Sequence, residues 1–193
     1  MSSIPKSAGA PEIIVTGRAN AGKSTLLNAV LKRTTLLSTS KKAGHTKALN
    51  FYAVGSDPIK LLLVDAPGYG ARGRPQWGEL FDHYIKTREQ LKRVYILFNA
   101  KHGLNQFDVQ MLEHLSENLM TAEGVQPFTL QSVITKVDTL PIGDTRAAIE
   151  KMRADIWKAA PLCLPPIITG AAMNPPFGLD ALRANIANAC GFS

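Results

Sequence analysis

The amino-acid sequence predicts an α/β fold in which a six-stranded, mostly parallel sheet is covered by helices on both faces. Short apolar runs alternate along the chain with segments whose apolar residues recur at helical spacing, which is typical of a doubly wound sheet. A turn signal at residues 55–58 separates two adjacent strand-like runs. We therefore expect one hairpin, and with it one antiparallel strand in a sheet that is otherwise parallel.

Apolar spacing and turn residues set the expected elements. We expect strands at residues 13–16, 48–54, 59–64, 94–98, 128–135 and 167–169. We expect helices at residues 23–32, 79–91, 105–120, 144–159 and 178–189. In the fourth helix, Asp144 is a suitable N-cap and Trp157 is expected on the core side. Pro165 and Pro166 are expected to interrupt the chain before the last strand.

Length and composition indicate one soluble domain. The chain has 193 residues, of which 45% are hydrophobic and 19% are charged, and no apolar run approaches the roughly 20 residues of a membrane span. We expect a flexible tail at residues 1–11 and a single, monomeric domain at 12–193. The tail is too short for a transit peptide, so either the protein stays where it is made or a presequence has been removed. The two cysteines, Cys163 and Cys190, lack metal-binding spacing and indicate a reduced compartment.

Residues 17–25 carry the pattern G-x-x-x-x-G-K-S between an apolar run and a helical segment. A phosphate-binding loop requires this strand–loop–helix context. Glycine admits backbone shapes that a Cβ would block, so successive amides can wrap a phosphate at the positive end of the helix dipole. Lys23 would reach the β/γ-phosphates and Ser24 would ligate Mg²⁺. The expected nucleotide-binding residues here are Gly17, Arg18, Ala19, Asn20, Ala21, Gly22, Lys23, Ser24 and Thr25.

The net charge of +7 is concentrated around this loop. Residues 1–50 hold eight Lys and Arg against one acidic residue, whereas residues 51–193 hold fourteen of each sign. The cations outside the loop that are candidates for a partner are Lys32, Arg33, Lys41, Lys42 and Lys47. They either contact a polyanion such as RNA or form a solvated basic face, and charge alone favours neither.

A D-x-x-G pattern, Asp65 to Gly68, ends the expected strand at 59–64. The Asp65 carboxylate is suited to hold Mg²⁺, directly or through water, and the Gly68 amide is suited to sense a γ-phosphate. The pattern is common in turns, but two strands after a phosphate loop it becomes specific.

Two later strand ends carry candidate base-binding loops. Asp138, in the run Thr135-Lys136-Val137-Asp138, can accept two hydrogen bonds from guanine that adenine does not offer. The aliphatic stem of Lys136 can lie along the base plane. The small residues Thr169, Gly170 and Ala171 would let a backbone amide reach the base oxygen.

This set of motifs resembles the translation-factor-related small GTPases, and more closely the EngB GTPases. The sequence segments that resemble EngB are residues 17–28, 42–47, 50–52 and 64–70. The resemblance implies a Ras-like GTPase domain that binds GTP and GDP with Mg²⁺ and hydrolyses GTP. It implies a partner in the large ribosomal subunit or its rRNA precursor, whose assembly the protein would assist. Gly44 and Thr46 would belong to the first switch, with Thr46 as a Mg²⁺ ligand in the GTP state, and residues 68–78 would form the second switch.

The chain also departs from that family. Residues 99–103 read N-A-K-H-G where the family often has D-x-R-H-G, and residues 71–76 differ from common bacterial versions. These differences suggest an organellar member in the mitochondrial matrix, the other expectation being the bacterial cytoplasm. Tyr69 stands where many GTPases have a glutamine that orients the attacking water, so we expect slow intrinsic hydrolysis.

The residues expected to act in hydrolysis are Lys23, Thr46, Gly68 and Asn20. Asn20 matches an asparagine that ligates K⁺ in related cation-dependent GTPases, but it is equally a turn residue that tolerates a left-handed backbone. Two other functions stay open at this point: a P-loop phosphotransferase acting on a small metabolite, and an RNA-binding module that uses nucleotide only structurally.

Overall fold

The computed structural model describes residues 9–32, 49–55, 58–70, 75–120, 124 and 127–192, without the side chains of residues 75–77. The strands are β1 (Glu12–Gly17), β2 (Asn50–Val54), β3 (Leu61–Asp65), β4 (Leu91–Asn99), β5 (Thr129–Thr135) and β6 (Leu164–Ile168). The helices are α1 (Lys23–Val30), α2 (Pro75–Thr87), α3 (Gln106–Glu117), α4 (Thr145–Ala159) and α5 (Leu179–Ala189), with a short 3₁₀ turn, η1 (Val137–Thr139).

The described strands form one six-stranded sheet in the order β2-β3-β1-β4-β5-β6. Only β2 runs antiparallel to its neighbour, and every other adjacent pair is parallel. The predicted fold class is therefore confirmed, including the single hairpin strand. Because β1 lies between β3 and β4, the loop after β1 opens at the middle of the carboxyl edge of the sheet, where α/β folds bind ligands.

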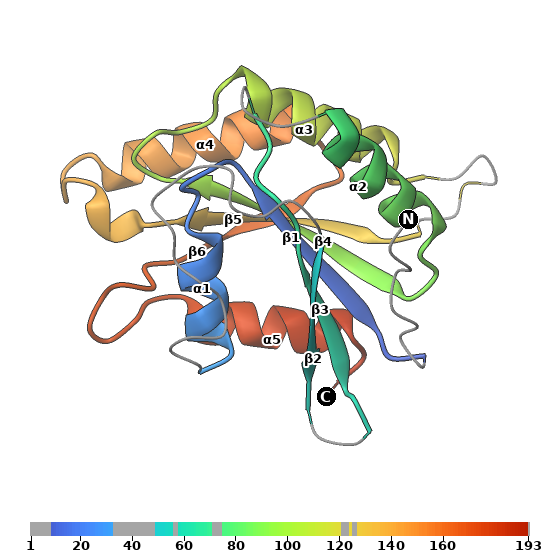
Figure 1. Cartoon of the computed structure of the whole chain (residues 1–193). Coiled ribbons are helices and arrows are strands. Elements are labelled where there is room, and N and C mark those ends of the chain that lie inside the picture. The colour runs from blue at the N-terminus through green and yellow to red at the C-terminus, as the bar shows by residue number, and fades with distance from the viewer. Residues whose placement is uncertain are drawn as a thin grey trace.

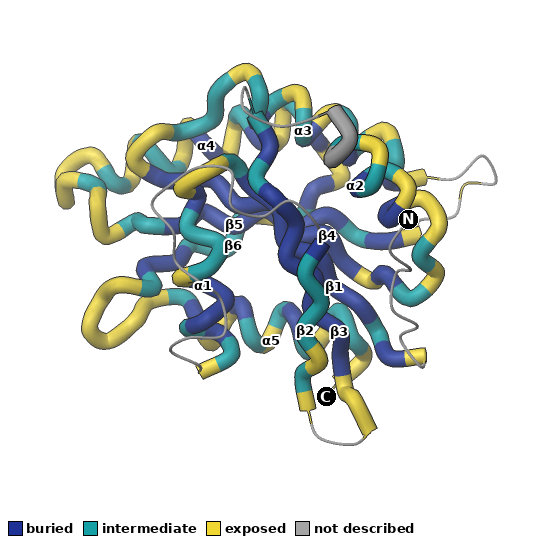
Figure 2. Tube along the Cα trace, viewed as in Figure 1, coloured by how far each residue is buried: buried dark blue, intermediate teal, exposed yellow. Residues whose placement is uncertain are grey.

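Helices cover both faces of the sheet, with α2, α3 and α4 on one side and α1 and α5 on the other (Figure 1). The side chains of successive β1 residues point to opposite faces of the sheet. Ile14 packs in the core beneath α2–α4, whereas Ile13 and Val15 pack against α1 and α5. The buried residues accordingly follow the strands and the inner sides of the helices (Figure 2).

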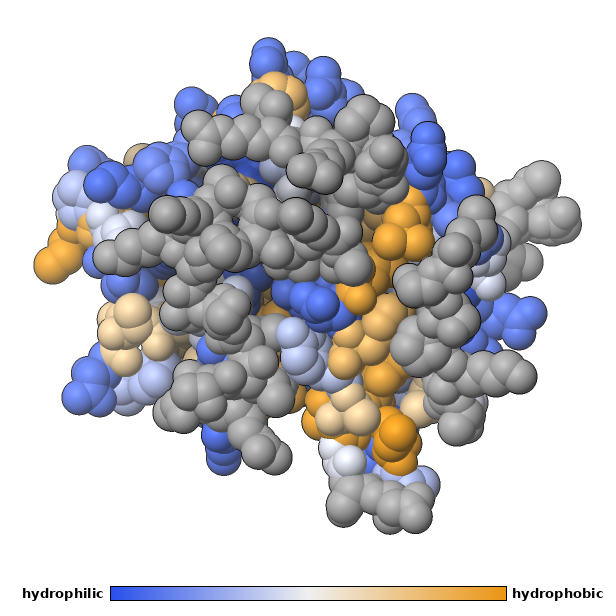
Figure 3. All heavy atoms as spheres, viewed as in Figure 1, coloured by the Kyte–Doolittle hydropathy of each residue, from blue (hydrophilic) through white to orange (hydrophobic). Residues whose placement is uncertain are grey.

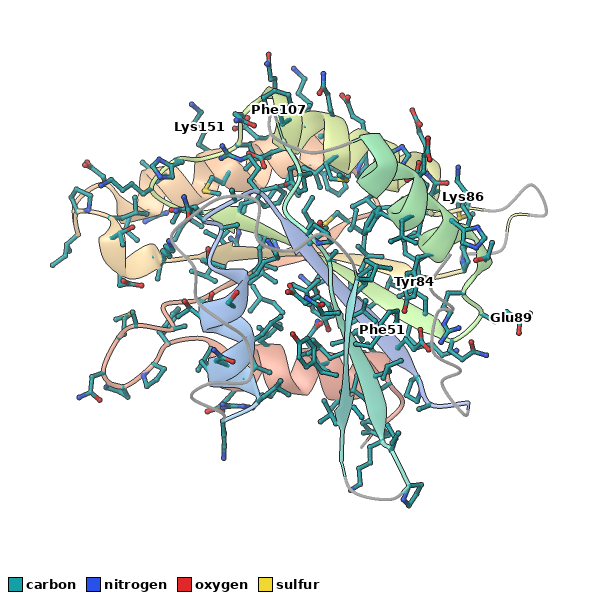
Figure 4. The ribbon with its side chains drawn as sticks, viewed as in Figure 1. Phe51, Tyr84, Lys86, Glu89, Phe107 and Lys151 are labelled. Carbon is teal, nitrogen blue, oxygen red and sulfur yellow. The ribbon has the colours of Figure 1, made fainter. Side chains whose placement is uncertain are left out.

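Polar networks also join helices to the sheet. Glu12, fully buried at the start of β1, accepts hydrogen bonds from the Tyr84 hydroxyl and from Arg88, whose Nε and Nη2 lie 2.8 and 2.7 Å from its two oxygens. The Tyr84 ring packs edge-on against Phe51, and the two labelled side chains lie together between α2 and β2 in Figure 4. On the opposite face, Asn185 of α5 accepts hydrogen bonds from Arg93 and Tyr95.

Several expected boundaries are wrong. Helix α2 begins at Pro75 and ends at Thr87, rather than spanning 79–91, since proline is favoured in the first turn of a helix. The prolines 165 and 166 lie inside β6 rather than before it, which an edge strand allows. Asp144 does take the N-cap position of α4 but makes no side-chain capping hydrogen bond.

Trp157 is not a core residue. It is 67% exposed, although Met152 and Ile156 on the same helix are buried as expected. Each residue turns an α-helix by about 100°, so the position after Ile156 has already left the buried stripe.

The described surface in Figure 3 is mostly polar, with hydrophobic side chains gathered over β2 and β3 and beneath α2. Across the part of the chain that the structure describes, no helix has both the length and the apolar character needed to cross a membrane.

Candidate nucleotide-binding site

The loop between β1 and α1 is shaped by close backbone packing. An ideal Cβ on Gly17 would lie 2.9 Å from the Leu97 carbonyl oxygen and 3.2 Å from the Ala21 Cβ. Gly22, at the N-cap of α1, has φ +90°, a left-handed conformation that favours glycine. It has no side chain to cap the helix, and the first turn of α1 carries no acidic residue. The first amides of the helix therefore remain available to an anion, as a phosphate loop requires.

The opposite charges of Lys23 and Asp65 interact in the predicted site. The Lys23 Nζ donates a 3.2 Å hydrogen bond to the Gly17 carbonyl, which holds the ammonium over the loop. Burial lowers the pKa of Lys23, an effect that the Asp65 carboxylate partly offsets. Burial raises the pKa of Asp65 to about 6, against the opposing influence of Lys23 and of a hydrogen bond with the Asn50 side chain.

The Asp65 carboxylate fits the role of a magnesium ligand. The residue is only 4% exposed, and within the described residues its Oδ1 is buried without a hydrogen-bond partner. Buried oxygens are normally satisfied, so a carboxylate oxygen without a partner among the described residues is suited to accept a cation or its water. The described residues hold no cluster of three or more His, Cys, Asp and Glu side chains suited to a metal. The ion would therefore depend on Asp65, the Ser24 hydroxyl and phosphate oxygens.

Gly68 lies against the phosphate loop, as its predicted role requires. A Cβ on this residue would be 3.1 Å from the Ala19 amide nitrogen and 3.3 Å from the Gly17 carbonyl oxygen. The D-x-x-G segment and the phosphate loop thus meet backbone to backbone, at a distance that only glycine allows without displacement.

The base-binding candidates also pack on this loop. Thr135 Oγ1, buried at the end of β5, donates a 2.6 Å hydrogen bond to the Ala21 carbonyl. Lys136 has φ +57°, and its Cε lies 3.4 Å from the position of a Cβ on Gly22. Its stem therefore runs beside the phosphate loop, while Asp138 in η1 is exposed to solvent.

The last predicted loop completes the group. The Val137 amide donates to the Thr169 carbonyl at 3.2 Å, and Asp138 Oδ1 lies 3.2 Å from the position of a Cβ on Gly170. The Gly170 amide is already bonded to the Phe177 carbonyl at 3.1 Å. Of the small residues in this loop, Ala171 is therefore the better candidate to donate to a base.

Asn20 has the left-handed backbone that its role as a turn residue predicts, with φ +65°. Its side chain is exposed, and its backbone carbonyl accepts a 3.4 Å hydrogen bond from Asn99 Nδ2. Asn99, in the N-A-K-H-G run, is thus a support of the phosphate loop that sequence reasoning missed. A cation-binding role for Asn20 stays a prediction.

The Tyr69 side chain points into the protein. It is 6% exposed, and its hydroxyl donates a 2.8 Å hydrogen bond to Asp108 Oδ1 on α3. Burial, reinforced by the Asp108 charge, raises the pKa of Tyr69 well above its usual value. Arg18 of the phosphate loop pairs with the same carboxylate, with its Nε 2.9 Å from Oδ2. Sequence reasoning missed Asp108, because nothing in its local pattern connects it to either partner.

The remaining predicted residues fall into two groups. In the described part of the chain, Ser24 is half-buried and Ala19 and Thr25 are exposed beside the loop. Gly44 and Thr46 lie outside the described residues, as do most cations of the N-terminal excess (Lys6, Arg33, Lys41, Lys42 and Lys47). The first switch and the basic segment accordingly stay predictions.

Comparison with known proteins shows the family to which the chain belongs. The model of the family described as "50S ribosome-binding GTPase" matches residues 12–134. The protein named "Probable GTP-binding protein EngB" of Brucella melitensis is 36% identical over 191 residues, covering 93% of this chain and 75% of that protein. The protein of the same name from Bacillus subtilis is 36% identical over 155 residues, covering 77% and 74%.

Solved structures with the same fold are more distant in sequence. Era, in complex with MgGDPNP and nucleotides 1506–1542 of 16S ribosomal RNA, superposes with a TM-score of 0.64 at 22% identity. The alignment covers 93% of this chain but only 56% of the Era chain, so this likeness concerns the fold alone. Elongation factor SelB of Methanococcus maripaludis, bound to a GTP analogue, gives a TM-score of 0.61 at 20% identity over 93% of this chain and 33% of SelB. Fold, motifs and relatives together place this chain in the EngB family of GTP-binding proteins.

Proposed function

We propose that this protein is a GTP-operated switch that binds the large ribosomal subunit during its assembly and is reset by slow hydrolysis. The proposal that the protein binds a guanine nucleotide rests mainly on one observation: the loop after β5 contacts the phosphate loop. Thr135 and Lys136 contact the phosphate loop, while Asp138, at the same strand end, lies beside Gly170. A ligand with phosphates at one loop and a base at the other would touch both. A carboxylate in that place accepts hydrogen bonds from guanine and would be left unpaired by adenine.

Magnesium would be held by Ser24 and Asp65, joined in the GTP state by Thr46. When bound, the ion supplies charge neutralisation at the β- and γ-phosphates. Asp65 Oδ1, which has no hydrogen-bond partner among the described residues, supports this assignment. Lys23 would place its charge on the same phosphates, and the amides at the start of α1 would bind the β-phosphate.

Intrinsic hydrolysis is expected to be slow, at about 10⁻³ per second or below, the order found where an essential group is missing. The Tyr69 hydroxyl supports this rate because it is engaged by Asp108, away from the place where a water-orienting side chain would be needed. The missing contribution comes either from K⁺ held near Asn20 or from the ribosomal partner. Both would supply positive charge or positioning in the transition state.

The geometry gives less support to the two alternatives. A phosphotransferase acting on a small metabolite would not need the carboxylate of Asp138 beside Gly170. An RNA-binding module that uses nucleotide only structurally would not need the buried Asp65 Oδ1, which lacks a partner in the part of the chain that the structure describes. Both features are accounted for if the chain binds guanine nucleotide with magnesium.

The ribosomal partner is inferred from the family description and from the basic N-terminal quarter of the chain. Era was solved with a fragment of ribosomal RNA, which supports RNA as a partner class for this fold. The relatives reported above are bacterial, so we propose a bacterial-type ribosome. Such ribosomes occur in the bacterial cytoplasm and in the mitochondrial matrix, and we propose that a monomer acts in one of these compartments.

Co-sedimentation tests the proposal. Purified bacterial-type large subunits, mature and precursor, are incubated with the protein in a GTP analogue or GDP, at two salt concentrations. We expect binding that requires the triphosphate, with a salt slope that counts the phosphates neutralised by the basic residues.

Two variants make this test specific. Lys23→Ala removes the cation of the phosphate loop and should abolish the difference between nucleotides. Lys92→Ala removes an exposed lysine near the amino end of β4, far from the loop, and should leave the difference unchanged. Equal, weak and salt-erased binding in both nucleotide states would contradict the ribosomal part of the proposal. That result would not contradict the binding of guanine nucleotides, which nucleotide titration tests.

A further inference from the structure

One buried carboxylate joins three segments at the edge of the candidate site. Asp108, 1% exposed in the first turn of α3, accepts a 2.8 Å hydrogen bond from the Tyr69 hydroxyl and pairs with Arg18 Nε at 2.9 Å. Its Oδ2 also accepts from the Asn105 amide at 2.9 Å, which completes a capping box at the helix start. Because the helix itself fixes this carboxylate, Asp108 is a rigid attachment point for the other two residues.

The two residues it holds flank a contact within the site. Tyr69 directly follows Gly68, and Arg18 lies between Gly17 and Ala19. Gly68 packs on those same two neighbours, with its Cβ position 3.1 Å from the Ala19 nitrogen and 3.3 Å from the Gly17 oxygen. Asp108, on α3, therefore binds one residue of the D-x-x-G side of this contact, Tyr69, and one residue of the phosphate loop, Arg18.

We propose that Asp108, through Tyr69 and Arg18, is a positioning residue that holds the Gly68 amide where a γ-phosphate would be sensed. The inference rests on the proposed nucleotide function. Amides at the start of α1 meet phosphates that GTP and GDP share, whereas the Gly68 amide meets only the phosphate that GTP adds. Loosening the Asp108 attachment should therefore weaken GTP binding more than GDP binding and slow hydrolysis as well.

A purely structural role would produce a different pattern. The chain offers a matched comparison, since Tyr84, Glu12 and Arg88 form a second group of one phenol, one buried carboxylate and one guanidinium. Glu12 starts β1, whereas the phosphate loop follows the end of that strand, about 16 Å away at the usual rise per residue. Figure 4 shows the separation: Phe107, the neighbour of Asp108, is at the top on α3, and Tyr84 lies well below it beside Phe51.

The experiment compares Tyr69→Phe, Asp108→Asn and Tyr84→Phe with the unaltered chain. For each protein, the dissociation constants of GDP and of a non-hydrolysable GTP analogue are measured at equilibrium with magnesium. Single-turnover hydrolysis of GTP and thermal unfolding are measured on the same samples. Tyr69→Phe removes one hydrogen bond and keeps the Arg18 ion pair, so it tests the inference even where Asp108→Asn fails to fold.

We expect Tyr69→Phe and Asp108→Asn to raise the dissociation constant of the GTP analogue about tenfold relative to that of GDP, the scale of one hydrogen bond to a charged group. Hydrolysis should slow in both. Tyr84→Phe should lower the unfolding temperature yet keep the ratio of the two constants. A ratio unchanged in Tyr69→Phe, or equal losses for both nucleotides, would overturn the inference and make Asp108 a structural residue only. Failure of the unaltered chain to bind either nucleotide would overturn the proposed function, and this inference with it.

Discussion

Thr135 donates its hydroxyl proton to the carbonyl oxygen of Ala21 across a distance of 2.6 Å, although 114 positions separate the two residues in the chain. Both residues are buried. The bond links the end of β5, which carries the base-binding candidates, to the phosphate loop after β1. This bond fixes the position of the base-binding candidates relative to the phosphate loop, although the two lie far apart in the sequence.

Thr135→Val should show how much this hydrogen bond contributes to stability and to nucleotide binding. Valine has nearly the shape of threonine but has no hydroxyl to donate, so the buried Ala21 carbonyl loses this hydrogen bond at a cost of about 1–3 kcal/mol in unfolding free energy. Urea unfolding measures the loss, and equilibrium titration should show weaker binding of GDP. Thr145→Val is the matched control, because that exposed hydroxyl also donates to a backbone carbonyl, at 2.9 Å, outside the site. Equal costs for the two variants would contradict a special role for Thr135.

Asp138→Asn should change which base is preferred. The carboxylate would accept two hydrogen bonds from guanine, whereas an amide both donates and accepts, which matches the ring carbonyl of xanthine better. Competition of GDP and XDP for a fluorescent nucleotide measures the preference, which should move from guanine toward xanthine. Asp144→Asn, also an exposed carboxylate after β5, should leave it unchanged. A variant at 138 that still prefers GDP would remove the base-reading role from this residue.

The Asp65 carboxylate should make the metal-free protein less stable as pH rises. Burial raises its pKa to about 6 from the ordinary 3.8, so between these values the folded chain binds a proton that the unfolded chain has lost. Stability then falls as pH rises through this window and levels off above pH 6, at a total cost of about 3 kcal/mol. The charged carboxylate is the form suited to bind a cation, which would offset this cost in the proposed magnesium site.

Asp65→Asn isolates this contribution. Urea unfolding is measured with EDTA and without nucleotide between pH 4 and 7, for the variant and the unaltered chain. The other titrating groups cancel in the difference, which should favour the variant increasingly up to about pH 6. A difference that does not change with pH would show that Asp65 ionises as freely in the folded chain as in the unfolded one.

Gly178 and Gly191 allow backbone strain to be separated from crowding. Their φ values are +75° and +73°, yet a Cβ on Gly178 would lie 2.0 Å from the Ile168 carbonyl oxygen, whereas one on Gly191 would meet nothing within 4 Å. Gly191→Ala should cost about 1–2 kcal/mol, the price of a left-handed alanine. Gly178→Ala should cost clearly more, because the start of α5 must also move off β6. Urea unfolding of both variants checks this order, and similar losses would show that the chain relieves the clash freely.

Local patterns predicted the order of strands and helices and the loops that meet at the sheet edge. This succeeded because glycine spacing and strand ends are short-range features, and the carboxyl ends of neighbouring parallel strands necessarily lie together. Gly68 and Asp138 accordingly lie where their motifs placed them, beside Ala19 and Gly170.

What the sequence did not reveal depends on contacts between distant segments. Asp108 looks like an ordinary helix-capping residue, and only the packing of α3 brings it to Arg18 and Tyr69, 90 and 39 positions away. Asn99 similarly gains its contact with Asn20 through the fold. Trp157 was misplaced for a simpler reason, since one position along a helix separates a buried face from an exposed one.

The two prolines of β6 determine what this edge of the sheet can offer to another chain. An edge strand normally presents a row of amide donors to which a strand of another chain can add, the first step toward aggregation. Pro165 and Pro166 have no amide proton to give, so this border of the sheet is a poor template for self-association. This edge of the sheet is therefore protected against the addition of a strand from a second copy of the chain.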